Sequence, residues 1–206
     1  FVSNQAIPLE SNHAPNFAAS YGLAVASNGK AIAIWSHVNK DTAGNPISTS
    51  IWAKPYTPES KWGVTQPVSA VGINSHSQKI VLDPKGNGVA IFSEGNISKS
   101  ARYNAGIDTW TSPAENIGLY GPELSISRGS SGAVTAITQR LDLTISPVRM
   151  TGLYANRSQD GVGWLANEKT VKSNATNYYA RPPVLATADD GTTFVLFDYF
   201  NQDPTP

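Results

Sequence analysis

The fold is indicated first by the segment Leu23-Ala-Val-Ala-Ser-Asn-Gly29-Lys-Ala-Ile-Ala-Ile-Trp35, which recurs as Ile80-Val-Leu-Asp-Pro-Lys-Gly86-Asn-Gly-Val-Ala-Ile-Phe92. Each copy has two short apolar runs separated by a polar turn that ends in glycine. Because glycine adopts a positive φ without a Cβ clash, this pattern predicts two strands joined as a β-hairpin. Two weaker copies follow. The four turn glycines, Gly29, Gly86, Gly132 and Gly191, lie 57, 46 and 59 residues apart.

Three of the hairpins are followed by an extended segment that ends in Tyr, then by a polar turn, and then by Trp. The Trp lies 6, 7 or 10 residues after the Tyr, and an apolar residue follows it after six or seven more. Each unit is therefore predicted to contain four strands. We expect the Trp side chains to pack between units, because they recur in register with the repeat. The pairs are Tyr56 and Trp62, Tyr103 and Trp110, and Tyr154 and Trp164.

The fold is predicted to be all-β. No window longer than about one turn has the 3.6-residue apolar period of a helix, and 17 Gly and 14 Pro interrupt the chain. Four-strand units of roughly 46 to 59 residues in tandem favour a β-propeller, in which neighbouring blades cover both faces of each sheet. A β-sandwich also has short, evenly spaced strands, but it does not require the same hairpin and Tyr–Trp pair in each unit.

We expect a single propeller domain over residues 1–206, built from about four blades. Residues 1–10 resemble the fourth strand of a unit, with Phe1 in place of Trp62. The predicted order is a fourth strand, three complete units and a final hairpin. Three arrangements remain open: a ring with one thin blade, a part of a larger ring, and a ring completed by a second subunit. The repeat units are about 20–72, 78–120, 123–172 and 183–200.

Composition restricts the partners of the chain. It has 15 Lys and Arg against 15 Asp and Glu, and charged residues make up only 15% of it. Without a basic patch for phosphates or anionic lipids, we expect no nucleic-acid partner and no membrane insertion. The absence of Cys excludes disulfides, thiolate metal sites and Cys nucleophiles. A Cys-free, weakly charged chain rich in Asn, Ser and Thr predicts an extracytoplasmic protein, either secreted, periplasmic or on the cell surface.

The hairpin pattern followed by Tyr, a Gly/Asp turn and Trp resembles the repeats of bacterial sialidase-like and Asp-box propellers, over about Ser20 to Phe200. The Asp-box pattern is approximated by Ser158-Gln-Asp160-Gly161-Val-Gly-Trp164. In that superfamily Asp-boxes are structural turns, and the sialidase arginine motif has no counterpart in this sequence. The resemblance therefore implies a sialidase-like propeller without sialidase activity, in a class whose non-catalytic members act as lectins or protein-docking platforms.

A ligand site is expected where the loops after each second strand and the connections between units gather at one face of the ring. These segments carry polar and aromatic residues suited to neutral or weakly charged sugars, because hydroxyls pair with polar groups while a sugar ring stacks on an aromatic ring. Trp52 is included as an expected exposed aromatic on a third strand. The predicted ligand-binding residues are His13, His37, Trp52, His76, Glu94, Tyr120, Arg140, Asp142, Tyr178, Arg181 and Asp198.

Three hypotheses for the function remain open. The first is a non-catalytic module that binds a glycan or a protein partner on this loop face. The second is a glycoside hydrolase or lyase in which Glu94 and Asp142 or Asp198 act as acid and base. The third is a purely structural array within a larger assembly. We expect no cofactor, and no metal because the three histidines lack a close ligand spacing such as His-x-His.

Overall fold

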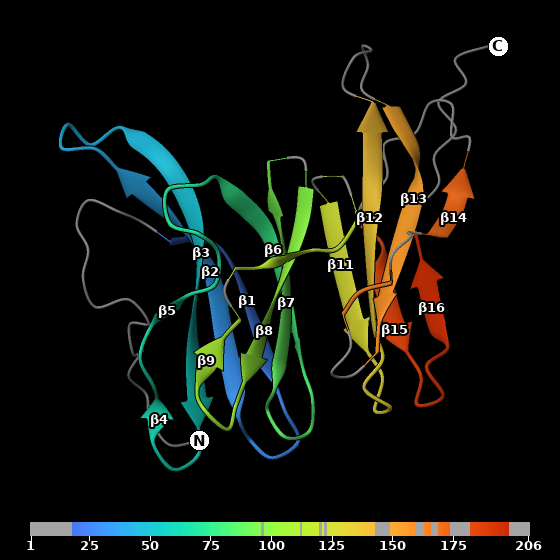
Figure 1. The fold of residues 1–206 in the computed structure, drawn as a ribbon, viewed down its shortest axis with the longest axis horizontal. Helices are drawn as coiled ribbons and strands as arrows, with labels where there is room; N and C mark the ends of the chain where they lie inside the picture. Colours follow the sequence, from blue (N-terminus) through green and yellow to red (C-terminus); the bar gives the residue numbers. More distant parts are fainter. Residues whose placement is uncertain are drawn as a thin grey trace.

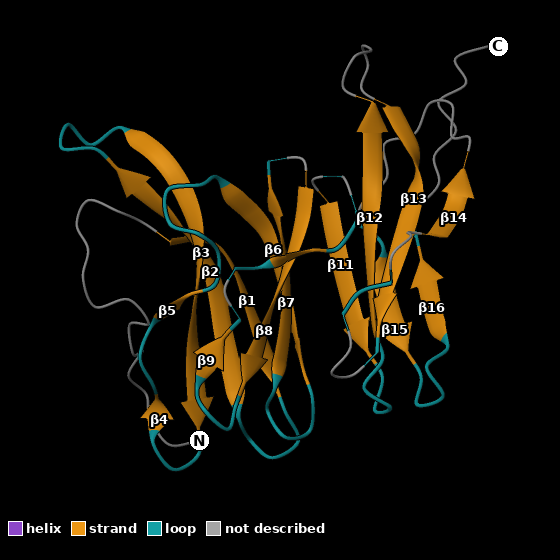
Figure 2. Cartoon of the chain, viewed as in Figure 1, coloured by secondary structure: helices purple, strands orange, loops and turns teal. Residues whose placement is uncertain are grey.

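The chain is all-β in the part that the structure describes, as predicted. The computed structural model contains strands and turns there and no helix (Figures 1 and 2). None of the described segments is therefore a helix long and apolar enough to cross a membrane. For residues 140–142, 149–151 and 169–173 only the backbone is described. The described residues are 18–95, 97–111, 113–119, 121, 123–142, 149–159, 163–165, 169–173 and 182–197.

The described strands form three antiparallel sheets and one hairpin, in chain order. Sheet 1 contains β1 (Ala18–Val25), β2 (Ala31–Lys40), β3 (Pro46–Thr57), β4 (Lys61–Trp62) and β5 (Gln66–Pro67). Sheet 2 contains β6 (Ser75–Leu82), β7 (Gly88–Glu94), β8 (Ile97–Asn104), β9 (Thr109–Trp110) and β10 (Glu115–Asn116). Sheet 3 contains β11 (Glu123–Arg128), β12 (Val134–Asp142), β13 (Arg149–Ser158) and β14 (Lys169–Ser173), and the hairpin contains β15 (Val184–Thr187) and β16 (Thr193–Leu196).

The fourth strand of sheets 1 and 2 is divided into two short strands. Both β4 and β5 pair with β3, and both β9 and β10 pair with β8. In sheet 1 the interruption lies at Pro55, between Ala53, which pairs with Gln66, and Tyr56, which pairs with Trp62. Because proline has no N–H, it cannot donate to the ladder at this point. The predicted fourth strand is thus present as a discontinuous edge.

The glycine turns of the repeat share one hydrogen-bond pattern. In each turn the N–H of the first residue donates to the carbonyl four residues later, and the glycine N–H donates back to the carbonyl of that first residue. The φ angles of Gly29, Gly86, Gly132 and Gly191 are 81°, 90°, 88° and 83°. Residues with a Cβ are strained at these angles, which explains why glycine recurs at this position.

The sheets pack face to face in the order of the chain. The β6 strand contacts β1, β2 and β3 of sheet 1, β11 contacts β6 and β7 of sheet 2, and β15 contacts β11 of sheet 3. Figure 1 shows the sheets side by side along the long axis of the molecule. In a β-propeller, consecutive blades succeed one another in this way.

Three apolar cores lie between successive sheets. Phe92 belongs to the first core, and Tyr103 and Trp110 pack there as a cross-strand pair whose ring centroids are 5.3 Å apart. Tyr154 and Trp164 pack against the second core. For these two units the predicted packing role of Trp is confirmed. The first core includes Ile32, Ile34, Ile51, Ala90 and Phe92; the second includes Ile91, Ile117, Leu119, Leu124 and Ala136; the third joins Ile137 and Leu153 to Leu185, Val195 and Phe197.

Candidate functional site

The predicted loop-face site lies mostly outside the described part of the chain. His37, Trp52, His76 and Glu94 have described side chains. Because the side chains of the other predicted residues are not described, the loop-face site remains a prediction. Of the other predicted residues, Arg140 and Asp142 are described by their backbone alone, and His13, Tyr120, Tyr178, Arg181 and Asp198 lie outside the described residues.

His37 lies within β2 and not in a loop after it, because the strand continues to Lys40. The side chain of Asn39 donates hydrogen bonds to the hydroxyls of Ser48 and Ser50 on β3, at 2.9 and 3.2 Å. Polar residues that bond across two strands thus extend the sheet where the sequence predicted its end. His37 is buried and contacts Trp52 edge-on, with ring centroids 6.1 Å apart. Trp52 is half-buried rather than exposed.

His76 and Glu94 occupy separate surroundings. His76 is an exposed residue of β6, and its Nδ1 lies 3.0 Å from the hydroxyl of Ser77. Glu94 ends β7, and its Oε2 lies 3.8 Å from Nζ of Lys99. Glu94 also lines a hollow of about 530 Å³ together with Gln66 and residues of β9. Its predicted partners Asp142 and Asp198 are not described at the side-chain level, so the carboxylate pair remains a prediction.

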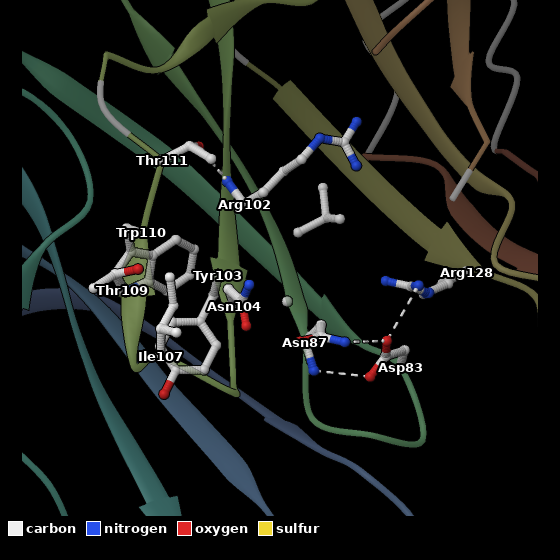
Figure 3. Close-up of a pocket in the computed structure, with 12 residues that line it drawn as sticks. Asp83, Asn87, Arg102, Tyr103, Asn104, Ile107, Thr109, Trp110, Thr111 and Arg128 are labelled. Carbon is white, nitrogen blue, oxygen red and sulfur yellow. Dashed lines mark hydrogen bonds and ion pairs between the residues drawn. The ribbon is translucent and has the colours of Figure 1, made fainter. Parts of the chain in front are cut away.

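A larger hollow, of about 660 Å³, is lined by residues of sheet 2 and by Arg128 of sheet 3 (Figure 3). Asp83 and Asn87 come from the β6–β7 turn, and Asn104 ends β8. In an antiparallel meander, the β6–β7 and β8–β9 turns lie at the end of the sheet opposite the β7–β8 loop. This cleft therefore opens near the end of the array opposite the predicted loop face. Its polar and aromatic lining consists of Asp83, Asn87, Arg102, Tyr103, Asn104, Thr109, Trp110, Thr111 and Arg128.

Asp83 organises the inner part of the cleft. Its Oδ1 accepts hydrogen bonds from the N–H groups of Lys85 and Asn87, both at 2.8 Å, and its Oδ2 accepts one from Nδ2 of Asn87 at 2.8 Å. A guanidinium nitrogen of Arg128 extends from β11 to within 3.7 Å of Oδ2 (Figure 3). Both side chains are buried. The ion pair thus joins sheets 2 and 3 where the repeat elsewhere places small or apolar residues.

Arg102 forms the second polar connection between these sheets. Its Nε lies 3.2 Å from Oε1 of Glu115 in sheet 2, and a terminal nitrogen donates to the hydroxyl of Ser158 in sheet 3 at 2.8 Å. The backbone N–H of Arg102 donates to the hydroxyl of Thr111 at 2.8 Å. Two arginines, each beside a carboxylate, make the cleft strongly polar but balanced in charge.

These cleft residues were missed by sequence reasoning because they are distant in the chain. A signal was present in the repeat itself. Asp83 stands where the other turns have Ala26, Gly129 and Ala188. Arg128 likewise stands where the other first strands end in Val25, Leu82 and Thr187. Departures of this kind from a local pattern mark candidate functional positions.

The aromatic wall of the cleft belongs to the architecture of the repeat. The Nε1 donors of Trp110 and Trp164 are both buried without a hydrogen-bond partner among the described residues. The two Trp residues belong to successive units of the repeat, so these buried donors are not specific to the cleft. Tyr103 donates a 2.6 Å hydrogen bond to Oδ1 of Asp108, which also accepts one from Gln66 of sheet 1 at 3.0 Å. Burial, the hydrogen bond and the charge of Asp108 raise the pKa of Tyr103 above its usual value.

Tyr103→Phe is expected to flatten the loss of stability at alkaline pH. Because the folded state raises the pKa of Tyr103, its contribution to stability is complete below the ordinary tyrosine pKa of 10.0 and decreases as the pH rises beyond it. The free energy of unfolding of the wild type should therefore fall more steeply above pH 10 than that of the variant. Urea denaturation at a series of pH values measures both slopes, and equal slopes would contradict the expectation.

Neither a protein-family model nor a curated protein matches this sequence. Among solved structures, a protein of unknown function from Dyadobacter fermentans matches with a TM-score of 0.61 and 18% identity, over 85% of this chain and 47% of that chain. The chain thus spans about half the length of that structure. At this identity the similarity concerns the fold alone. A Hadza microbial sialidase (TM-score 0.49, 12% identity, 80% of this chain and 39% of that chain) also matches. So does an exo-1,5-α-L-arabinanase from a bovine ruminal metagenomic library (0.48, 12%, 84% and 72%).

Proposed function

We propose that the chain is a non-catalytic binding module of the β-propeller class that recognises a neutral glycan in the cleft between sheets 2 and 3. The observation that carries this proposal is the cleft itself. Its volume of about 660 Å³ lies within the range of small-ligand sites, and it brings Asp83, Asn87, Arg102 and Arg128 to one hollow. Extracytoplasmic localisation stays part of the proposal, supported by the absence of Cys and the low charge.

The chemistry of the lining supports a sugar ligand. Sugar hydroxyls both donate and accept hydrogen bonds, and the cleft offers guanidinium donors, a carboxylate acceptor, and the amides of Asn87 and Asn104, which do both. Trp110 and Ile107 add an apolar wall for the C–H face of a sugar ring. Since Asp83 balances Arg128 and Glu115 balances Arg102, the charges favour a neutral glycan over a phosphorylated one.

The hydrogen bonds of Asp83 favour binding over cleavage. Both of its carboxylate oxygens accept hydrogen bonds from the turn, and Oδ2 also faces Arg128. A carboxylate held in this way serves as a fixed acceptor and is not positioned to donate a proton or to attack a substrate. The hydrolase hypothesis relies instead on Glu94 and the rim aspartates.

A glycan-array screen followed by calorimetry tests the proposal. For the glycan bound most tightly, Arg102→Gln is expected to weaken binding about tenfold or more, because a charged hydrogen bond to a ligand contributes roughly 1.5 to 3 kcal/mol. Glu94→Gln is the matched control and should leave the affinity unchanged, since Glu94 lines a different hollow. Circular dichroism would verify that both variants are folded.

Three outcomes would overturn parts of the proposal. Binding to no glycan would contradict the ligand class. Loss of binding in Glu94→Gln but not in Arg102→Gln would move the site to the loop face. Release of new reducing ends from the bound glycan, abolished by Glu94→Gln, would contradict a non-catalytic role and support a glycoside hydrolase.

A further inference from the structure

Sheet 1 exposes an apolar row on its first strand. Tyr21, Leu23 and Val25 alternate along β1 and pair with Trp35, Ala33 and Ala31 of β2, so they lie on one face of the sheet. Tyr21 is 93% exposed, and Leu23 and Val25 are also mostly exposed. We call these three residues the β1 face.

The β15–β16 hairpin exposes a second apolar row at the other end of the array. Val184 pairs directly with Leu196, and Phe194 lies two positions before Leu196 on the same side of β16. All three side chains are mostly exposed. The opposite side of the hairpin carries Leu185 and Val195, which pack against the third core. We call Val184, Phe194 and Leu196 the β16 face.

The repeat shows what kind of surface the β1 face is. Leu23 lies six residues before its turn glycine, as do Ile80, Ile126 and Leu185. Each of these three equivalents packs against the core shared with the preceding sheet. In β1 the same position has no preceding sheet to cover it among the described residues. The β1 face is therefore the following half of an interface between sheets.

The β16 face is the other half of the same interface. Leu196 lies five residues after its turn glycine, at the position of Ile34, Ile91 and Ile137. Those three residues are 0% exposed, because the next sheet covers them, whereas Leu196 is 73% exposed. An apolar surface of this kind on a soluble protein marks an interaction site. The described chain thus presents both halves of an interface that it already builds three times.

We infer that the β16 face of one copy of the chain binds the β1 face of a second copy. In this contact the two copies would pack against each other as successive sheets of one chain already do. No charged residue occurs in β1, β15 or β16, so these three strands bring no ionised group into the contact. Because the two surfaces differ, the association is heterologous and either closes into a ring of copies or extends as an array.

Sedimentation velocity of the whole chain tests the association. Between roughly 1 and 100 μM the wild type should form dimers or larger species in a concentration-dependent manner. Leu23→Asp and Leu196→Asp should each weaken association about tenfold or more, because each places a charge in an apolar contact. Val64→Asp is the control, since Val64 is equally exposed but lies between β4 and β5. A wild type that stays monomeric would overturn the inference and would favour further repeats of the same kind as the binding partners of the two faces.

Mixing the two variants distinguishes the heterologous contact from any other. Neither variant alone retains both halves of the interface. A mixture of Leu23→Asp and Leu196→Asp combines one intact β16 face with one intact β1 face, so it should form a complex at concentrations where each variant alone associates much more weakly. Formation of this complex would itself show that both variants are folded, and circular dichroism of each variant alone verifies folding before the two are mixed. A mixture that remains monomeric, or one variant that dimerises as well as the wild type, would overturn the inference.

Discussion

Phe92→Ala is expected to lower the free energy of unfolding by about 3 to 5 kcal/mol, the largest effect of any substitution considered for this protein. Phe92 is fully buried in the first core, where it lies with Ile32 and Ile34 of the preceding sheet. Removing the ring loses its transfer free energy and leaves a cavity that the two packed sheets cannot easily collapse. Equilibrium urea denaturation measures the loss.

Phe197→Ala is the matched control for this prediction. Phe197 occupies the same repeat position as Phe92, but it is only partly buried, against the third core. Since less apolar surface is exposed to water on unfolding, the loss of stability should be clearly smaller. Phe92→Leu should likewise cost much less than Phe92→Ala, because it keeps most of the volume. Equal losses in Phe92→Ala and Phe197→Ala would show that the inter-sheet cores do not determine the stability of the array.

Asp83→Ala is expected to destabilise the protein by about 3 kcal/mol, because it removes a buried carboxylate from its ion pair and leaves Arg128 buried without it. The substitution also removes the acceptor of three hydrogen bonds in the β6–β7 turn. The two kinds of interaction act on different parts of the fold. The hydrogen bonds hold the β6–β7 turn, and the ion pair joins sheets 2 and 3. Urea denaturation again gives the free energy of unfolding.

Asp41→Ala separates these two effects. The carboxylate of Asp41 accepts the same two backbone hydrogen bonds in the β2–β3 turn, from Ala43 and Asn45, and also one from the amide of Asn45. Asp41 is only half-buried, and among the residues that the structure describes no ion pair to another sheet accompanies it. If the inter-sheet pair carries most of the effect, Asp41→Ala should lose clearly less stability than Asp83→Ala. Equal losses would attribute the effect to the turn alone.

The turns of the repeat could be predicted because their cause is local. Gly29, Gly86, Gly132 and Gly191 all take the positive φ that glycine tolerates, and the strands on both sides pair as expected. The Tyr103 and Trp110 pair was also correctly placed between sheets, since two residues that recur at fixed spacing in a four-stranded unit face the same neighbour. Each of these features depends on residues that are close together in the chain, which explains why it can be predicted from one sequence.

Strand ends were predicted less well, because a polar residue does not by itself end a strand. Strand β2 continues past His37, since the amide of Asn39 donates hydrogen bonds to the hydroxyls of Ser48 and Ser50 on β3. The third unit also departs from the first two. Tyr154 pairs with Thr170 instead of Trp164, which forms a bridge with Ser158, because ten residues separate the Tyr from the Trp. Such differences depend on which strand lies opposite, and that is a tertiary property.

The sequence by itself determined the all-β class, the glycine turns and the four-strand unit. Hairpins and the alternation of apolar and polar residues along a strand depend on neighbours in the chain. Only the tertiary structure decided where a cleft forms and which side chains line it. Asp83, Arg102 and Arg128 belong to three different strands or turns, and they meet because sheets 2 and 3 pack against each other. It also decided which apolar rows are covered. Leu23 and Leu196 resemble in sequence the equivalent residues that a neighbouring sheet covers, and only the packing of whole sheets shows that no described neighbour covers these two.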